Sequence, residues 1–452
     1  MNDKRVEGKV QDSQIRVTNF LEVEEGYQEE EALTEASRCL QCVNPRCVKG
    51  CPVGIQIPHF IKAIKENRMQ DAYDIILESS SLPAVCGRVC PQEKQCESFC
   101  VKGLKGDAIA IGALERYVAD YALAHDFSST NRKSPNGKKV AIVGSGPSGL
   151  TCAGELARSG YEVVIYEVLH KAGGVLTYGI PEFRLPKRIV QREVENLEKL
   201  GVVIQTDVLI GNTITLKELQ DEYDAVYIGS GAGLPKFMGI EGEDANQVFS
   251  ANEILTRINL MGAYMEEANT PIKKCKTAYV IGGGNVAMDA VRSLKRLGID
   301  AHLMYRRSEE ELPARKMEVM HAKEEGIVFD VLTNPVRILT DENNNVIGME
   351  VVDMELGEEG EDGRRSVHEK ENSLHPVPCE MIVMALGTSP NHQALKESDV
   401  QLTDRGLIVV DGTRTSSNHV YAGGDAVTGA ATVILAMEAG KKAAKEIMED
   451  LQ

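Results

Sequence analysis

The chain has 452 residues, of which 42% are hydrophobic and 26% charged, and this length predicts two or three domains rather than one core. Its net charge of −18 argues against nucleic-acid binding, because contact with phosphates needs a basic surface. No apolar run is long enough to span a membrane, and the polar start MNDKRVEGKVQDSQ lacks the apolar stretch of a signal peptide, so we expect a cytoplasmic protein.

The part of the chain before the first glycine-rich motif, 1–130, is expected to form a small helical domain. Residues 1–30 are polar and acidic, which indicates an arm or an early helix. In residues 57–77 apolar side chains recur at helical spacing, at Ile57, Phe60, Ile61, Ile64, Ala72, Ile75 and Ile76.

Eight of the eleven cysteines lie in this helical part, in two runs. The first run is Cys39-x2-Cys42-x4-Cys47-x3-Cys51-Pro52, and the second is Cys86-x3-Cys90-Pro91-x5-Cys96-x3-Cys100. The first is close to the bacterial ferredoxin run, in which the fourth cysteine ligates the other cluster. We therefore expect two 4Fe–4S clusters, with Cys51 and Cys100 each crossing to the cluster of the other run.

Zinc, disulfides and a thioredoxin-type redox pair are the alternatives. Zinc sites are usually built from CxxC pairs, and only Cys39-x2-Cys42 has that spacing. Disulfides are rare in a reducing compartment, and a thioredoxin-type pair needs a CxxC beside a flavin, whereas Cys275 and Cys379 are isolated. Together with Cys152, these two are expected to be packing residues.

Residues 128–137, SSTNRKSPNG, are polar and rich in chain breakers, which predicts a linker. Two strand–glycine turn–helix units follow it, beginning at Lys139 and Thr277. Two copies of this unit predict two dinucleotide-binding domains.

The first unit carries the turn GSGPSG between the strand VAIV and the helix LTCAGELARSG, and its second strand ends at Glu167. Glycines allow a tight turn and a close approach of the backbone to a pyrophosphate, which sits at the helix N-terminus. Glu167 stands at the distance beyond Gly146 where a carboxylate of this fold accepts hydrogen bonds from a ribose. The expected binding residues are Gly144, Gly146, Pro147, Gly149 and Glu167; the alternative is a glycine turn without a ligand.

A second signal for a flavin lies near the end of the chain. Tyr421-Ala-Gly-Gly-Asp425-Ala precedes a small-residue helix at 430–444. In flavoproteins with two dinucleotide domains, a similar segment brings an aspartate to the ribityl chain. We therefore expect FAD in the first domain, with Asp425 as a contact, and a discontinuous first domain that is completed by the C-terminal segment.

The second unit carries Gly282-Gly283-Gly284-Asn285-Val286 and then the strand AHLMY. When the two units are aligned on Gly146 and Gly284, the counterpart of Glu167 is Tyr305 rather than an acid, and Arg306 and Arg307 follow it. Arginine suits the 2′-phosphate of NADPH through charge-assisted hydrogen bonds, so we expect NADPH rather than NADH at Gly283, Gly284, Asn285 and Val286. The alternative is that both arginines are solvated, and Arg315 is a weaker candidate for the same phosphate.

Seven motifs together resemble the small subunit of NADPH-dependent glutamate synthase. They are RCLQC-x4-C-x3-CP, SLPAVCGRVCPQEKQCE, VAIVGSGPSGL, GIPEFRLPK, GGGNVAMDAVR, YRRSEEELPAR and AGGDAVTGAATV. The chain is also similar to the large subunit of NADH-dependent ferredoxin:NADP oxidoreductase and to the N-terminal half of dihydropyrimidine dehydrogenase.

The resemblance implies an α/β protein with an N-terminal helical di-cluster domain and two Rossmann-like domains. The expected limits are 1–130 for the clusters, 136–250 and 376–452 for FAD, and 251–375 for NADPH. It implies one cluster on Cys39, Cys42, Cys47 and Cys100, and a second on Cys51, Cys90 and Cys96 with either Cys86 or Glu115 as fourth ligand. As a helical glutamate, Glu115 has a solvated or ion-paired surface position as its alternative. Gly173, Gly174 and residues 179–182 are implied to wrap the flavin.

The resulting hypothesis is an oxidoreductase subunit that passes electrons between NADP(H), FAD, the clusters and a second protein subunit, with no catalytic side chain of its own. The partner is expected to be the small flavoprotein of the ferredoxin:NADP enzyme, in which the present flavin bifurcates electrons. The large subunit of glutamate synthase is the alternative, and a non-catalytic cofactor-binding scaffold is a remote one. The arm GYQEEEALTEASRCLQC favours the ferredoxin:NADP type.

Overall fold

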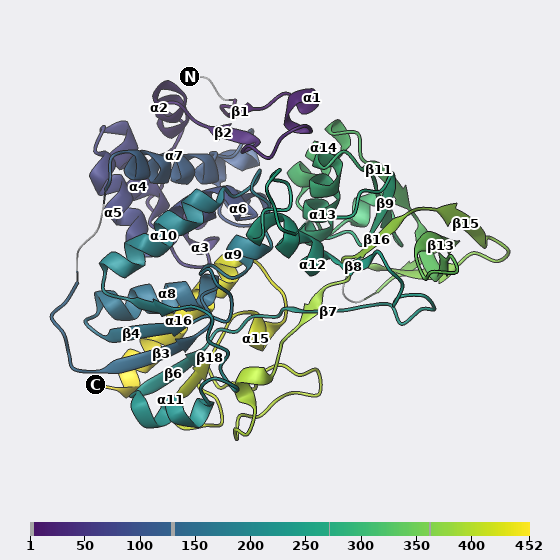
Figure 1. The fold of residues 1–452 in the computed structure, drawn as a ribbon. Helices are drawn as coiled ribbons and strands as arrows, with labels where there is room; N and C mark the ends of the chain where they lie inside the picture. Colours follow the sequence, from purple (N-terminus) through teal and green to yellow (C-terminus); the bar gives the residue numbers. More distant parts are fainter. Residues whose placement is uncertain (1–3, 128–131, 271, 361–362) are drawn as a thin grey trace.

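The computed structural model describes residues 4–127, 132–270, 272–360 and 363–452, and it contains a helical part and two parallel sheets (Figure 1). The helical part lies at the upper left of Figure 1, the first sheet below it, and the second sheet to the right. Among the described residues, none of the helices combines the length and apolarity that crossing a membrane requires. The predicted linker at 128–137 begins in residues 128–131, which lie outside the described part.

The N-terminal part is helical, as the sequence predicts, and an extended arm precedes it. The arm holds β1 (Lys9–Val10), α1 (Ser13–Arg16) and β2 (Glu24–Gly26). The helices that follow are α2 (Glu29–Ser37), α3 (Arg46–Lys49), α4 (Ile57–Lys65), α5 (Met69–Leu77), α6 (Pro83–Val89) and α7 (Ile111–Ala124), with short turns η1 (Gln92–Lys94) and η2 (Val101–Leu104). Helix α4 buries Ile57, Phe60, Ile61 and Ile64, so the apolar spacing of the sequence becomes its core face.

The first parallel sheet has the order β18-β6-β3-β4-β5. Its strands are β3 (Lys139–Val143), β4 (Glu162–Tyr166), β5 (Val203–Gln205), β6 (Ala225–Ile228) and β18 (Val420–Ala422). Strand β18 pairs with β6 although the whole segment 229–419 separates them, so the sheet is discontinuous in sequence. Helices α8 (Pro147–Arg158), α9 (Val175–Tyr178), α10 (Lys187–Lys199), α11 (Leu216–Glu222), α15 (Asp425–Thr428) and α16 (Val433–Asp450) belong to this part.

The second parallel sheet has the order β11-β10-β9-β16-β8. Its strands are β8 (Val248–Ser250), β9 (Thr277–Ile281), β10 (Asp300–Tyr305), β11 (Val328–Val331) and β16 (Met381–Met384), with α12 (Ala251–Leu255), α13 (Asn285–Arg296) and α14 (Lys316–Glu324) around it. Strands β8 and β16 lie outside the expected limits 251–375 of the second dinucleotide domain, yet both pair within its sheet. The glycine motif marks only the start of the unit, and no comparable turn marks the strands that close it.

An antiparallel sheet extends the second part, and the sequence reasoning did not anticipate it. It contains β12 (Thr333–Thr340), β13 (Val346–Glu359), β14 (Arg365–Glu369) and β15 (His375–Pro378). A short ladder of β7 (Leu234–Pro235) with β17 (Thr388–Ser389) joins the two segments that run between the parallel sheets (Figure 1).

Candidate functional site

The first glycine turn lies between β3 and α8, and its glycines serve different purposes. Gly144 has φ +97°, a left-handed conformation that glycine adopts without strain. An added Cβ at Gly149 would lie 2.0 Å from the carbonyl oxygen of Gly144, so α8 can approach the turn only through a glycine. A Cβ at Gly146 would meet no atom within 4 Å, which leaves the open space that a pyrophosphate needs in front of α8. Pro147 is the first residue of α8.

The acid at the end of β4 is placed beside this turn. Glu167 is buried, and its Oε2 accepts hydrogen bonds from the backbone N–H (2.9 Å) and hydroxyl (2.5 Å) of Ser145. Its Oε1 accepts one from the N–H of Leu169 at 2.9 Å. A carboxylate has about four lone-pair positions, so one more acceptor position remains for a ribose hydroxyl.

Two further segments of the chain enclose the same site. Asp425 begins α15, and burial raises the pKa of its carboxyl. Gly174 has φ +53°, and a Cβ there would lie 2.8 Å from the Cα of Gly146, so the loop before α9 touches the glycine turn. A Cβ at Gly424 would lie 3.0 Å from the Cβ of Ser148, so the start of α15 also touches α8. Residues of three distant segments thus meet at one place, which fits an extended dinucleotide such as FAD.

Tyr178 and Lys187 belong to this region, and the sequence reasoning did not single them out. Burial, with the carboxylates of Asp425 and Glu167 nearby, raises the pKa of Tyr178 to about 12. The Lys187 ammonium donates to the carbonyl oxygens of Leu176 (3.0 Å), Ile180 (2.5 Å) and Leu185 (3.0 Å), while burial lowers its pKa to about 8. Lys187 therefore fixes the GIPEFRLPK loop from inside. In the sequence, only its position within that motif could have indicated this role.

The second glycine turn repeats the arrangement between β9 and α13. Gly282 has φ +141°, and a Cβ at Gly283 would lie 2.7–2.8 Å from the side chains of Leu312 and Tyr305. A Cβ at Gly284 would meet nothing within 4 Å, so the N-terminus of α13 is open in the same way as that of α8. Asn285 begins α13, and its side-chain oxygen accepts a hydrogen bond from the backbone N–H of Arg315 at 2.9 Å. Val286 is exposed.

The three arginines considered for a 2′-phosphate have different surroundings. Arg306 is exposed, and no described residue forms a hydrogen bond or ion pair with its guanidinium. Arg307 donates from Nε to the carbonyl of Arg365 at 2.9 Å. Arg315 is buried and paired at 3.1 Å with Glu93 of the helical part, so its guanidinium is already engaged across the junction. Of these three arginines, Arg306 is therefore the freest cation at the end of β10.

Four thiols from both cysteine runs line one pocket in the helical part. They are Cys39, Cys42, Cys47 and Cys100, the set that the family resemblance implies for one cluster. Burial and then the neighbouring thiols Cys100 and Cys39 raise the pKa of Cys47 to about 11. Binding of iron to Cys47 would therefore release a proton from that thiol. Within the described residues no three ligands converge tightly enough for a single metal ion, whereas a 4Fe–4S cluster takes one thiolate at each of four separate iron corners.

A second group of ionisable side chains, made of Cys51, Cys90, Cys96 and Glu115, lies deeper in the helical part. Burial and then Glu115 raise the pKa of Cys51 to about 11, and burial, Glu97, Glu115 and Cys51 raise that of Cys96 strongly. A hydrogen bond with Cys86 and burial raise the pKa of Cys90. Glu115 of α7 therefore lies near Cys51 of the first run and near Cys90 and Cys96 of the second.

Glu115 and Cys86 differ in how their polar atoms are satisfied. Glu115 is 5% exposed, so a solvated surface position is excluded, and its Oε1 has no hydrogen-bond partner. Burial, with Glu193 nearby, raises the pKa of Glu115 to about 8. Cys86, by contrast, donates from Sγ to the sulfur of Met437 at 3.3 Å and also forms a hydrogen bond with Cys90. A buried carboxylate oxygen without a partner beside three thiols suits an iron ligand, because such an atom is otherwise costly to bury.

Helix α16 connects the deeper group to the first dinucleotide site. A Cβ at Gly440 would lie 2.2 Å from the Ser148 carbonyl, so α16 packs closely on α8. Met437 of α16 contacts Cys86, and Lys441 donates to the carbonyls of Val53 and Ser79 at 3.1 Å each. Val53 and Cys86, which are close in sequence to Cys51 and Cys90, therefore contact α16, the helix that packs on α8.

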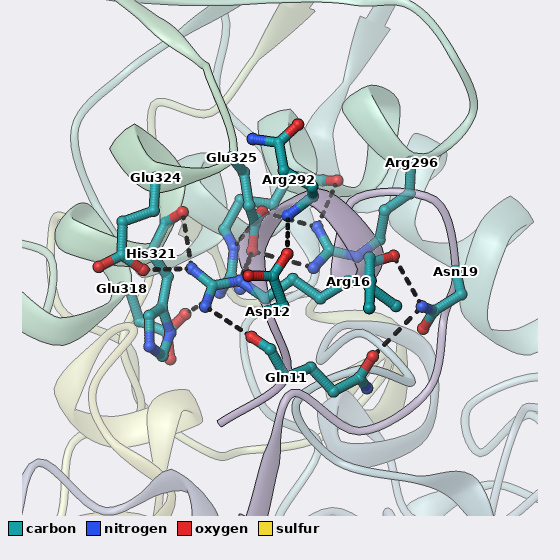
Figure 2. Close-up of polar contacts among 12 residues, drawn as sticks. Gln11, Asp12, Arg16, Asn19, Arg292, Arg296, Glu318, His321, Glu324 and Glu325 are labelled. Atoms are coloured by element: carbon teal, nitrogen blue, oxygen red, sulfur yellow. Dashed lines mark hydrogen bonds and ion pairs between the residues drawn. The ribbon is translucent and has the colours of Figure 1, made fainter. Parts of the chain in front are cut away.

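A buried ion-pair network holds the arm against the second dinucleotide part (Figure 2). Arg16 of α1 donates to Glu325 at 2.9 Å and to Glu324 at 2.6 Å. Arg292 and Arg296 of α13 donate to the same Glu325 at 2.7 Å each. Three guanidinium groups thus share one carboxylate, and burial would raise its pKa, but hydrogen bonds from Arg292 and Arg296 hold it well below the usual value.

The loop that follows α9 is fixed to the same helices. Arg184 pairs with Asp289 at 2.6 Å and with Glu318 at 2.9 Å. The guanidinium carbons of Arg292 and Arg296 lie 4.8 and 3.8 Å from the ring centre of Phe183. The loop implied to wrap the flavin is therefore joined directly to the helix that begins at the second glycine turn.

Two family models match the chain. Residues 16–127 match dihydropyrimidine dehydrogenase domain II, 4Fe-4S cluster, and residues 138–440 match pyridine nucleotide-disulphide oxidoreductase. The chain is 36% identical to the glutamate synthase (NADPH) small chain of Escherichia coli, over 99% of this chain and 98% of that protein.

Two further likenesses are partial. The beta subunit of the NADP(+)-dependent formate dehydrogenase of Moorella thermoacetica is 37% identical over 91% of this chain, which spans 60% of that subunit. The structure of Mycobacterium tuberculosis FprA in complex with NADPH superimposes with a TM-score of 0.60 at 20% identity, over 70% of this chain and 84% of FprA. The FprA likeness concerns the fold alone.

Proposed function

The chain belongs to the family of the glutamate synthase small chain, NADPH-dependent flavin and iron–sulfur oxidoreductases, and we propose that it carries electrons from NADPH to a partner subunit. The observation that carries this proposal is the arrangement along α16, which joins the glycine turn of α8 to the deeper thiol group. When bound, FAD exchanges a hydride with NADPH and single electrons with the clusters.

The residues of the chain have positioning roles in this proposal. Gly146 and Gly284 leave open the N-termini of α8 and α13 for two pyrophosphates, and Glu167 and Asp425 orient the sugar and ribityl portions of FAD. Arg306 and Arg307 bind the 2′-phosphate of NADPH. Cys51, Cys90, Cys96 and Glu115 hold the cluster near the flavin, and Cys39, Cys42, Cys47 and Cys100 hold the cluster nearer the surface.

The proposal also concerns the identity of the partner subunit. The arm sequence favours the small flavoprotein of a ferredoxin:NADP oxidoreductase, with which this chain would divide electron pairs between two acceptors. Near end-to-end similarity to glutamate synthase small chains supports the large glutamate synthase subunit as the second candidate. Purification from the native host with identification of the co-purifying protein separates the two.

A direct test of the enzymatic role is anaerobic addition of NADPH to the purified holoprotein. We expect bleaching of the flavin absorption band and then reduction of the clusters, seen by electron paramagnetic resonance. A flavin that stays oxidised would support the remote alternative of a cofactor-binding scaffold.

For the second cluster, we expect Glu115→Ala to lose about half of the bound iron, because one of two clusters loses a ligand. Cys86→Ser is expected to retain all of it, since Cys86 has hydrogen-bond partners within the protein whereas the Oε1 of Glu115 has none. Iron per chain and the cluster spectra are the measurements, with Cys152→Ser as a buried-cysteine control. The reverse pattern, with iron lost from Cys86→Ser alone, would assign Cys86 as the ligand.

For nucleotide choice, we expect Arg306→Ala to lower kcat/KM for NADPH by about 10- to 100-fold, the value of one charge-assisted hydrogen bond of roughly 1.5–3 kcal/mol. Activity with NADH, which lacks the 2′-phosphate, should stay constant and serves as the internal control. An equal loss with both nucleotides would show that Arg306 acts on something other than that phosphate.

A further inference from the structure

Helix α12 continues without a break into η3 (Thr256–Leu260), a π-helical turn at the junction of the two dinucleotide parts. The N–H of Met261 donates to the carbonyl of Thr256, five residues back, at 3.1 Å. Such wide turns are rare in proteins, and they occur frequently at functional sites. The turn contacts α9, which leads directly into the GIPEFRLPK loop of the first part.

One side chain of this turn, Asn259, is bonded to the end of α9. Asn259 is 7% exposed, and its Nδ2 donates to the carbonyl oxygens of Tyr178 at 3.1 Å and Gly179 at 3.3 Å. Both neighbours are acceptors, so only the nitrogen of the amide can face them, and this fixes the position of the oxygen. Asn259 therefore holds the second dinucleotide part to the loop that is implied to wrap the flavin.

The oxygen of the same amide has no partner. The Oδ1 of Asn259 is buried, and no described residue donates a hydrogen bond to it. Its chain neighbours Ile258 and Leu260 are buried apolar residues, and just beyond the turn Tyr264 stacks on Phe20 of the arm, with 4.3 Å between ring centres. A buried oxygen of this kind is unfavourable without a donor and is rare in native proteins. It therefore indicates a donor that the chain itself does not supply.

The surroundings of Tyr178 indicate where that donor comes from. Burial, and then the carboxylates of Asp425 and Glu167, raises the pKa of Tyr178 to about 12. Both carboxylates are assigned to FAD, so Asn259 reaches the border of the FAD site from the side of the NADPH part. The flavin and nicotinamide rings are the groups that meet between these two parts in the proposed function. Each ring carries an N–H donor, N3–H in the flavin and the carboxamide N–H in nicotinamide.

We propose that the Oδ1 of Asn259 accepts a hydrogen bond from an N–H of one of these two rings, so that a single amide joins the ring, the flavin loop and the second dinucleotide part. This proposal rests on the proposed function, because it requires FAD and NADPH to meet at this junction. An acceptor placed against an N–H also discriminates against a ring that lacks it, since the buried oxygen is then left unpaired.

The test measures binding to the oxidised protein, so it does not depend on turnover. NADP+ is compared with its 3-acetylpyridine analogue, in which a methyl group replaces the amide nitrogen, by titration of the flavin spectrum of the holoprotein. FAD is compared with 3-methyl-FAD on protein from which the flavin has been removed. We expect wild type to prefer the natural member of one pair by about three- to tenfold, the effect of one hydrogen bond.

The decisive variant is Asn259→Ala, which should abolish that preference by weakening binding of the natural ligand. Asn259→Asp keeps an acceptor and loses the N–H donors to the loop, so it should retain the preference and separates the bond to the ring from the bond to the loop. Asn252→Ala is the matched control, because Asn252 of α12 also donates to a loop carbonyl, that of Gly233 at 3.1 Å, and is partly exposed. It should leave both preferences unchanged.

A preference for NADP+ that Asn259→Ala removes would assign the partner as nicotinamide, and the same result for FAD would assign the flavin. Equal binding within both pairs in wild type would overturn the proposal and leave Oδ1 to a buried water. A preference that survives in Asn259→Ala, or that is lost in Asn259→Asp or Asn252→Ala, would also overturn it. NADPH that fails to reduce the flavin while the preference for FAD holds would overturn the proposed function and leave the contact of Asn259 with the flavin in place.

Discussion

Gly146→Ala is expected to give a folded protein that purifies without FAD. An added Cβ at this position meets no protein atom within 4 Å, so the fold itself has room for it. The same space is where a pyrophosphate approaches the backbone at the N-terminus of α8. We expect FAD affinity to fall by about a hundredfold or more, which corresponds to roughly 3 kcal/mol. The flavin-to-protein ratio after gel filtration and the thermal midpoint of the flavin-free proteins are the measurements.

Gly149→Ala is the matched comparison. The two glycines belong to one turn, but the two substitutions should impair the protein for different reasons. Its Cβ would lie 2.0 Å from the Gly144 carbonyl oxygen, so α8 must move away from β3. Overpacking of this kind costs about 1–3 kcal/mol or more, and it should lower the thermal midpoint even without flavin. If Gly146→Ala kept its FAD, or if it unfolded as readily as Gly149→Ala, the assignment of the open space to a dinucleotide would be wrong.

Glu325→Ala is expected to destabilise the protein by about 3–5 kcal/mol, the usual effect of leaving buried charges without their partner. Arg16, Arg292 and Arg296 would all lose the carboxylate that they share. Release of Arg16 should also free the arm, so trypsin is expected to cleave after Arg16 in the variant and to spare that bond in the wild type. The measurements are the thermal midpoint and peptide mass analysis after brief trypsin treatment.

Glu324→Ala provides the control for that experiment. Glu324 pairs with the same Arg16 at 2.6 Å, but its side chain is 45% exposed, so we expect a loss of at most about 1 kcal/mol. A loss as large as that of Glu325→Ala would contradict the importance of the shared buried carboxylate.

The lowered pKa of Glu325 also makes the stability of the folded protein depend on pH. Its contribution to stability is complete above the pKa of an unfolded glutamate, about 4.3, and is lost as the pH falls toward the lower folded-state pKa. Wild type should therefore lose stability on acidification more steeply than Glu325→Ala.

Local signals made the glycine turns and the thiol groups predictable. A glycine turn depends on residues a few positions apart, and the ferredoxin-like spacing of Cys39 to Cys51 is equally local. The crossing of Cys51 and Cys100 between the clusters rests on the same spacing, through analogy with a known run, and stays a prediction. In each case the chemistry of the site requires particular residue types at short intervals.

The other features of the fold and the site depend on contacts between residues that are far apart in the sequence. Arg16 and Glu325 are 309 positions apart, and neither has a neighbour that identifies the other. The burial of Glu115 results from packing of α7 against α6 and the cysteine loops, and its sequence IGALERY equally suits a surface helix. Strands β8 and β16 are short, and only the pairing of β16 with β9 and of β8 with β16 shows to which sheet they belong.

The pairing of β18 with β6 has a consequence for the order in which the protein is made. A ribosome completes the whole second dinucleotide part before it reaches Val420, the first residue of β18, and α16 follows β18. Domains tend to fold as they emerge, so the inserted part is finished while the first sheet still lacks its edge strand and the helix that covers α8. A dinucleotide site that needs Asp425 and the packing of α16 on α8 is therefore complete only after the segment from β18 through α16 has been made.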